Sequence, residues 1–381
     1  MTSKWSLAGC LLGVAFMCFQ CGGYKASPVG AQLFQGQNPN MERHVTLTAA
    51  SSDTSYRIAV ACGGSSLLFI GNGRDLEAWT YVVFDTITID SLIKATLSFQ
   101  VRPYPVLNPG RVILSILPTG STWDETTMTW DNKILPSSET PLFQAEINSA
   151  DTSSIDLDVP LDVLATFVTK DTLTGRVGIL IKTESTGGLF QMNSLEYSAS
   201  STSYPHLTLY TASDTLIVSP SKDTFVSNSE LSSRSDILRI QDGIAERSLL
   251  HFNIAGIPVE ATINRAMLIL HADPEASVPD PSAMFFLAVS PVADSVWTVP
   301  NLKLDSTWVA YGSFTGDSVA VTVTSLVQKW TSQTFLNGGM MLTGVLEKSD
   351  LAGRSFFSSS SDSARMPRLD VYYSLAPSGR Y

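Results

Sequence analysis

The sequence predicts an all-β protein of two tandem antiparallel β-sandwich domains, jelly-roll-like in type, behind an N-terminal signal segment. Three observations predict this class. Short runs of alternating apolar and polar residues recur along the chain, turn-forming residues separate them, and each half shows one brief helical pattern. A parallel α/β fold needs many more helices, so the pattern argues against it.

Length and composition fit this class. At roughly 150 residues per domain, 381 residues predict two or three structural units. Charged residues make up 15% of the chain and apolar residues 44%, so the polar surface must rely on Ser, Thr and Asn, as in secreted β-rich proteins. The net charge is −11 and no basic stripe is present, which argues against nucleic acid as a partner.

The first 21 residues have the pattern of an export signal. Lys4 precedes an apolar stretch at residues 7–19, which is long enough for a signal peptide and too short for a membrane-spanning helix. No later segment approaches 18 consecutive apolar residues. We therefore expect an exported protein with no second membrane segment.

Cys21 follows this stretch and precedes two glycines, which resembles the processing site of a bacterial lipoprotein. This interpretation makes Cys21 the lipidated residue. It places the protein at the bacterial cell envelope, on the outer membrane or the cell surface, held by several acyl chains. Cys18 and Gln20 depart from the usual residues before such a cysteine, so an ordinary secretory signal cut within residues 22–27 remains the alternative.

The folded part then keeps a single cysteine, because Cys10 and Cys18 leave with the signal. Cys62 has no partner for an internal disulfide, and the apolar residues 58–61 before it predict a small core residue rather than a nucleophile. Stability must therefore come from packing within each domain.

After a turn-rich tether at residues 22–42, the chain repeats itself. Residues 79–84 correspond to residues 247–252, with the closing phenylalanines 168 residues apart, and residues 205–210 correspond to residues 367–372 at an offset of 162. Loop insertions in a duplicated domain produce this kind of drift. The alternative is that strands of any two β domains can be aligned, but shared glycines and the closing Pro-x-Leu segments argue against it.

We therefore expect a first β-sandwich domain at residues 43–212 and a second at residues 213–375, followed by a tail at residues 376–381. Within each domain, one long alternating run marks a half-buried strand, as at residues 95–101.

Several motifs carry a family resemblance. They are Asp223-Thr224-Phe225-Val226, LRIQDG at 238–243, RSLLHF at 247–252 and PRLDV at 367–371, with STWDETTMTW at 121–130 in the first half. Together they resemble DNRLRE domains, also described as disaggregatase-related and as a carbohydrate-binding module family of secreted and surface-attached microbial proteins. The resemblance covers residues 45–210 and 214–373. It implies two noncatalytic β-sandwiches that bind or display rather than cleave.

The chain also departs from the family pattern. The first half shows no Asp-Thr opening and no counterpart of Trp330, and the second half has Trp297 and Trp308 in place of the acidic Trp motif. A ligand site common to both halves is therefore not implied.

Catalytic patterns are weak, so we expect the protein not to be an enzyme. None of the four histidines lies near a Gly-x-Ser-x-Gly elbow, and no His/Cys cluster has zinc spacing. Asp124 and Glu125 could suggest glycoside hydrolysis, but adjacent residues of a strand point to opposite faces, which favours a structural role.

A structural calcium ion is the only cofactor that the acidic residues suggest, since hard cations take several oxygen ligands. The candidates are Asp156, Asp158, Asp162, Asp214 and Asp223. The chain has no Asp-x-Asp-x-Asp-Gly loop, so solvated acids are the favoured interpretation and the metal content stays unknown.

Sugar binding usually requires exposed aromatic faces, for which Trp123, Trp297 and Trp308 are the candidates; core packing is the alternative for each. The leading hypothesis is a lipid-anchored protein that binds polysaccharide or envelope glycans. The alternatives are a structural or adhesive envelope component that contacts protein partners, and a hydrolase or lyase with converging carboxylates. Fold alone does not decide between them.

Overall fold

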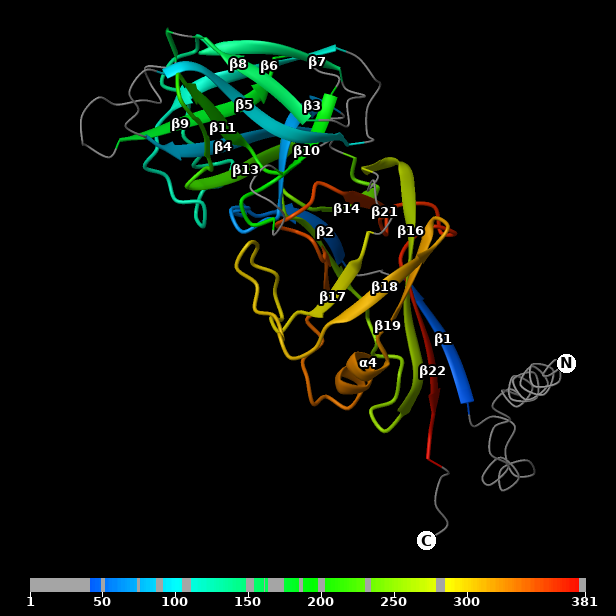
Figure 1. Ribbon diagram of the computed structural model, residues 1–381. Helices are drawn as coiled ribbons and strands as arrows, with labels where there is room; N and C mark the ends of the chain where they lie inside the picture. Colours follow the sequence, from blue (N-terminus) through cyan, green and yellow to red (C-terminus); the bar gives the residue numbers. More distant parts are fainter. Residues whose placement is uncertain are drawn as a thin grey trace, which may run out of the picture.

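The computed structural model describes residues 42–48, 52–73, 76–86, 92–104, 111–148, 154–160, 162–163, 175–184, 188–197, 203–229, 234–278 and 285–376. In this part of the chain the protein is all-β, with two large curled antiparallel sheets and the helix α4 (Thr324–Thr331) (Figure 1). The expected all-β class is confirmed. The signal segment with Cys21, the tether up to residue 41 and the tail from residue 377 lie outside the described residues. Within them, no helix has the length and apolarity to cross a membrane.

The first sheet occupies the upper lobe in Figure 1. Its strands are β3 (Leu67–Gly73), β4 (Leu76–Asp85), β5 (Leu92–Pro103), β6 (Arg111–Thr119), β7 (Phe143–Asn148), β8 (Ser154–Val159), β9 (Arg176–Thr183), β10 (Gly188–Asn193), β11 (His206–Thr211), β12 (Thr215–Val218) and β13 (Lys222–Ser229). Their order is β12-β11-β5-β10-β3-β4-β9-β6-β7, with β8 against β5 and β13 against β4.

The second sheet forms the lower lobe. Its strands are β1 (Glu42–Thr48), β2 (Ser52–Arg57), β14 (Ile237–Gln241), β15 (Glu246–His251), β16 (Thr262–Val278), β17 (Leu287–Pro291), β18 (Ala310–Thr315), β19 (Ser318–Thr322), β20 (Met340–Gly344), β21 (Gly353–Phe357) and β22 (Arg368–Ser374). The order is β1-β22-β16-β19-β18-β17-β20-β15-β14-β21, with β2 against β15 and β21 also against β16.

One long strand curls each sheet over its core. β5 pairs with β8 and β11 through residues 92–100, and with β10 through residues 101–103. β16 likewise pairs with β19 and β22 first, and with β21 after residue 271. Strict alternation then separates the core from the surface. In β8, for example, Ile155, Leu157 and Val159 are buried and the residues between them are exposed.

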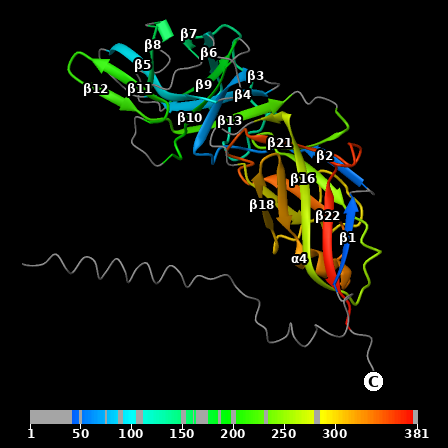
Figure 2. The same cartoon turned by 90° about the vertical axis from the view of Figure 1, so that its right-hand side faces the viewer.

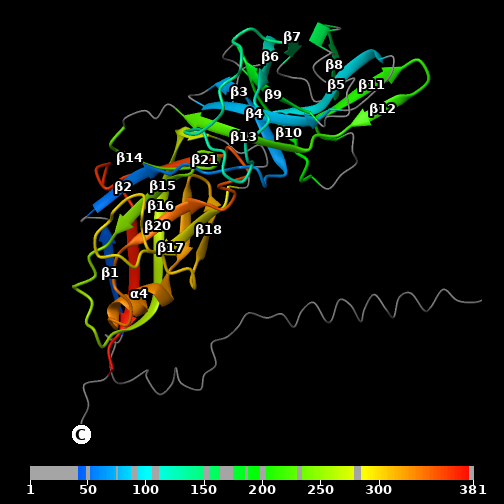
Figure 3. The same ribbon diagram turned by 90° about the vertical axis from the view of Figure 1, so that its left-hand side faces the viewer.

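The two halves of the chain exchange their first two strands. β1 pairs with β22 and β2 with β15, whereas β12 pairs with β11 and β13 with β4. Figure 2 shows β1 beside β22 in the second sheet, and Figure 3 shows β13 against β4 in the first. The sheets therefore do not follow the expected boundary between residues 212 and 213. An open strand edge accepts any segment of suitable pattern, and periodicity in a sequence does not record which edge a strand joins.

Hydrogen bonds repeated in both sheets show that the exchanged strands occupy equivalent positions. Asp223 Oδ2 accepts a hydrogen bond from Leu195 N at 2.8 Å, two residues past β10. Asp53 Oδ2 accepts one from Ser359 N at 2.6 Å, two residues past β21. Asp53-Thr54 is therefore the counterpart of Asp223-Thr224, which corrects the expectation that the first half has no Asp-Thr opening. The motif was overlooked because it lies before the segment where the alternation is strong.

The exchanged strands meet at the junction of the two sheets. Arg57, the last residue of β2, donates to Asn228 Oδ1 and Ser229 O at the end of β13, both at 2.7 Å. Tyr104 Oη donates to Asp350 Oδ1 at 3.0 Å across the same junction. Cys62 lies nearby with 2% of its surface exposed, and burial raises the pKa of its thiol to about 12. This matches the expected role as a core residue, because the reactive thiolate is not populated at neutral pH.

Candidate functional site

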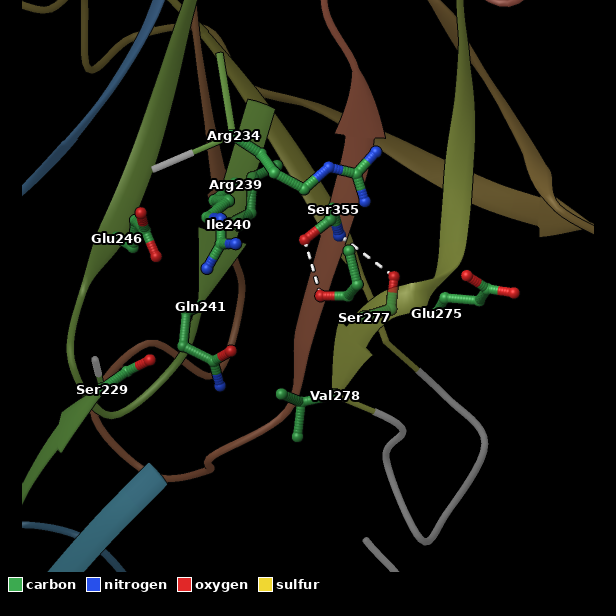
Figure 4. A pocket seen from close by; sticks show the side chains of 11 residues that line it. Ser229, Arg234, Arg239, Ile240, Gln241, Glu246, Glu275, Ser277, Val278 and Ser355 are labelled. Atoms are coloured by element: carbon green, nitrogen blue, oxygen red, sulfur yellow. Dashed lines mark hydrogen bonds between the residues drawn. The ribbon is translucent and has the colours of Figure 1, made fainter. Parts of the chain in front are cut away.

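A polar cavity of about 290 Å³ lies in the second sheet, close to the junction. This volume is near the lower end of small-ligand pockets, roughly 300 to 1,000 Å³. Figure 4 shows Glu246, Arg239 and Gln241 on one side of it, and Ser277, Glu275 and Ser355 on the other. The complete lining is Ser229, Arg234, Arg239, Ile240, Gln241, Glu246, Glu275, Ala276, Ser277, Val278 and Ser355.

Strand periodicity places the polar side chains of one wall. In β14, Leu238 and Ile240 are buried in the core of the second sheet, so the intervening Arg239 and Gln241 point to its other face. Glu246 begins β15 directly opposite Gln241. Alternation along two neighbouring strands therefore brings a guanidinium, an amide and a carboxyl group to one surface.

The opposite wall is fixed by internal hydrogen bonds. Ser355 N donates to Ser277 Oγ at 3.1 Å, and Ser355 Oγ donates to Ala276 O at 2.8 Å. Ser277 Oγ in turn donates to Asp273 O at 2.6 Å. These bonds hold the end of β16 against β21, so this wall is preorganised before any ligand arrives.

Arg234 at the rim is held by two carboxylates. Its Nη2 and Nε lie 2.9 and 3.1 Å from the two oxygens of Asp236, and its Nη1 lies 3.0 Å from Asp273 Oδ2. The hydrogen bonds from Arg234 lower the pKa of Asp236. The charge of this arginine is therefore compensated within the protein.

Glu246 is the most buried charged group of the lining, with 4% of its surface exposed. Burial raises the pKa of its carboxyl group to about 7, although the cations Arg239 and Arg57 act in the opposite direction. The group therefore changes charge near neutral pH, which is common at binding and catalytic sites.

The three tryptophans expected to bind sugar lie apart from this cavity. Trp123 is 6% exposed, with its ring 6.0 Å from that of Tyr81 and Lys222 Nζ 4.5 Å from its centroid. It fastens the loop after β6 to the outer face of the first sheet, within a buried cluster that includes Leu117 and Met128.

Trp297 and Trp308 are half-buried and satisfy their indole N–H groups inside the fold. Trp297 Nε1 donates to Gly338 O at 2.7 Å, and its ring joins a cluster with Leu249 and Met341 on the outer face of the second sheet. Trp308 Nε1 donates to Ser325 Oγ at 2.8 Å. The three rings belong to three different clusters, so the structure does not bring them together.

The acidic residues considered for calcium are also dispersed. Among the described residues no group of three Asp, Glu, His or Cys side chains is placed to hold a metal ion. Asp158 pairs with Lys94 Nζ at 2.6 Å, and Asp214 caps the turn between β11 and β12. Asp223 is 1% exposed, and burial raises the pKa of its carboxyl group to about 8. Asp156 and Asp162 are exposed.

Sequence reasoning missed the cavity, although three of its lining residues lie in a motif that it quoted. Arg239, Ile240 and Gln241 belong to LRIQDG at 238–243, and Glu246 lies three residues after this motif. Charged residues on alternate positions of a strand usually face water, so only the three-dimensional contact with β16 and β21 shows that these line a cavity.

Comparison with known proteins adds no assignment. No family model matches the chain, and no curated protein matches it either. The resemblance to DNRLRE domains therefore rests on the motifs alone.

Proposed function

We propose that this protein is a noncatalytic glycan-binding protein of the bacterial cell envelope, built from two jelly-roll-like domains of the DNRLRE type. The polar cavity of the second sheet supports this proposal best. Sugars present many hydroxyl groups, and the cavity offers a guanidinium, an amide, a carboxyl group and serine side chains within about 290 Å³.

The ligand in this proposal is a polysaccharide or a surface glycan, bound through one or two sugar residues that enter the cavity. Export by the N-terminal signal and lipidation of Cys21 complete the proposal, since they place the cavity outside the cytoplasm, where such glycans occur. The protein holds its ligand and performs no chemical step on it.

A pull-down of the chain from Glu42 to Tyr381, which keeps all of β1, with soluble and insoluble polysaccharides, with and without calcium, tests the proposal. We expect selective retention that Arg239→Met reduces at least about tenfold, because a hydrogen bond to a charged group contributes about 1.5–3 kcal/mol. The matched control is Arg111→Met, which removes an 82% exposed arginine paired with Glu146 on the first sheet. No retention on any polysaccharide would refute the proposal.

A structural or adhesive envelope protein is the second candidate, and one observation favours it. Trp123 is 6% exposed, and Trp297 and Trp308 are half-buried and donate their indole N–H groups to Gly338 O and Ser325 Oγ, so all three contribute to internal packing. On this alternative, cross-linking in intact envelopes would capture protein partners, and Arg239→Met would leave that capture unchanged.

A further inference from the structure

The two sheets have the same strand arrangement but carry different side chains at equivalent positions. These differences produce the cavity in the second sheet. Arg239 pairs with Ser355, and Ser248 Oγ donates to its carbonyl. In the first sheet, Phe69 pairs with Gln191, and Thr80 Oγ1 donates to its carbonyl. The repeated pairing and the repeated hydrogen bond make Arg239 the counterpart of Phe69.

The neighbouring positions are also aromatic in the first sheet and polar in the second. The first sheet fills this place with aromatic rings: Phe69 lies 5.6 Å from Tyr104 and 5.0 Å from Phe225, measured between ring centroids, and all three are buried. By register, the counterpart of Phe225 is Ser55, and by its place after the strand proline the counterpart of Tyr104 is Glu275.

Glu246 lies at the position where the first sheet has a small residue, Ala78. It pairs with Gln241 as Ala78 pairs with Gly71, and Ala78 is fully buried. A buried carboxyl group costs far more to accommodate than a methyl group. The first sheet shows that the fold forms without it, so folding alone does not explain Glu246.

The carboxyl group of Glu246 faces the cavity rather than an internal partner in the part of the chain that the structure describes. Among the described residues no N–H or O–H group donates a hydrogen bond to it, although it is 4% exposed and lines the cavity. The oxygens of Glu246 are not among the side-chain atoms that are sealed from solvent without a partner, so the cavity gives them access to donors from water or a ligand.

The charges around Glu246 favour one class of ligand group as the hydrogen-bond donor to its carboxylate. Arg57 on β2 and Arg239 on β14 act on it directly, and Arg234 and Glu275 line the cavity beyond. β13 and β21 contribute only Ser229 and Ser355 to the lining. Two flanking guanidinium groups disfavour an ammonium ion, and the two Glu side chains disfavour an anion. Neutral hydroxyl groups fit both conditions.

We propose that neutral sugar hydroxyl groups donate hydrogen bonds to the carboxylate of Glu246, and that binding is therefore coupled to loss of a proton from this residue. This inference rests on the proposed function and specifies the ligand group. Hydroxyl donors stabilise the charged carboxylate more than the neutral acid. Bound ligand thus lowers the pKa of Glu246 from about 7, and by linkage the affinity rises as the pH passes that value.

The test is calorimetric titration of the full chain with the neutral hexasaccharides of glucose, mannose, xylose and N-acetylglucosamine at pH 5.5 and pH 8.0. Each unit by which ligand lowers the pKa strengthens binding about tenfold, so we expect three- to tenfold tighter binding at pH 8.0. Glu246→Gln should bind more weakly than the wild type at pH 8.0 and equally at both pH values. Glu275→Gln, at the exposed rim, should keep the pH dependence.

The outcomes separate this inference from the proposed function. Equal wild-type affinity at both pH values, or a pH dependence that Glu246→Gln retains, overturns the role of Glu246 and leaves glycan binding intact. Absence of binding to all four hexasaccharides and to the polysaccharides of the pull-down overturns both. Repeating the titration in two buffers of different ionisation enthalpy gives the number of protons released, which should be above zero only for chains that contain Glu246.

Discussion

Equivalent positions carry aromatic side chains in the first sheet and polar side chains in the second. Phe69, Tyr104 and Phe225 form a buried aromatic cluster in the first sheet, while Arg239 and Glu275 line a polar cavity in the second. The strand order around these positions is the same. One molecule thus contains an internal control, which shows that the fold tolerates either filling and that polarity at these positions is not a condition for folding.

The sheets also differ in how their exchanged strands are attached. β12 is connected to its partner β11 by the short turn at residues 212–214, where Thr211 N donates to Asp214 O at 2.9 Å. β1 has no such connection, because its partner β22 lies at the other end of the described chain. The first sheet therefore receives β12 through a local turn, and the second receives β1 from a distant part of the sequence.

Removal of β1 and β2 should have the largest effect and should act on the second sheet. A chain that starts at Ile58 leaves the edges of β15 and β22 unpaired, and we expect a loss of at least about 5 kcal/mol, comparable to the stability of a whole domain. Hydrogen exchange of the backbone amides measures it. Protection should fall in β15, β20 and β22, and a peptide of residues 42–57 should restore it. Loss of protection in β3 and β4 instead would break the comparison.

Phe69→Ala should cost about 3–5 kcal/mol, because it leaves a cavity between Tyr104 and Phe225. Arg239→Ala at the equivalent position should cost less than about 1 kcal/mol, since its side chain borders a cavity that already exists. Urea unfolding of both variants provides the measurement. Similar losses for the two would show that Arg239 is a structural residue.

Asp223→Asn should stabilise the protein at alkaline pH. The folded-state pKa of Asp223 is about 8, raised from 3.8 chiefly by burial, with repulsion from Glu196 and Glu125. Its contribution is fully present below about pH 4 and is lost as the pH rises through 8, because only the folded state holds the proton in that window. Asparagine carries no charge, so we expect a gain of about 2 kcal/mol at pH 9 and little change at pH 4.

Asp53→Asn is the matched control in the second sheet. Asp53 is partly exposed and accepts the equivalent hydrogen bond from Ser359 N. We expect a loss of about 1 kcal/mol at pH 9, because the hydrogen bond from Ser359 N loses a charged acceptor. Thermal unfolding between pH 4 and pH 9 compares the two variants, and a gain for Asp53→Asn at pH 9 would mean that the two carboxyl groups are not distinguished by burial.

The smallest effect on glycan retention is expected for Trp297→Phe. It removes the hydrogen bond to Gly338 O and part of the ring that packs on Leu249, at a cost of about 1–2 kcal/mol, with glycan retention unchanged. Chemical unfolding and the pull-down are measured on the same preparation. Reduced retention at unchanged stability would return Trp297 to the list of binding residues.

The sequence is sufficient to predict the all-β class and the internal repeat. It is not sufficient to predict that the two halves exchange their first two strands. Alternation in segments such as residues 154–159 predicts strands because the period of two is local. β2 pairs with β15, and Asp53 accepts a hydrogen bond from Ser359 N, 306 residues away; no local pattern encodes contacts at this distance. For the same reason Arg239 and Glu246 cannot be distinguished from ordinary surface residues until β16 and β21 are placed against them.

The tryptophans illustrate the reverse case. Aromatic rings can stack on sugars, which makes the tryptophans candidates for binding, yet Trp123 and Trp297 occupy corresponding places, each packing the loop that follows β6 or β17 against an outer sheet face. A repeated aromatic position in a duplicated fold is better explained by a packing requirement common to both copies. The cavity residues differ between the copies, and that difference is the more useful signal of function.

The exchange of strands also determines which end of the molecule lies nearest to the N-terminal segment that contains Cys21. Glu42 pairs with Ser374, so the described chain begins and ends at one extremity, beside β22 and away from the first sheet (Figure 2). A lipid on Cys21 would therefore hold the C-terminal half of the sequence next to the membrane and project the N-terminal half outward. Lipidation at Cys21 would thus invert the order along the chain with respect to height above the bilayer, and on cells that display the protein an antibody against residues 143–148 would reach its epitope more readily than one against residues 324–336.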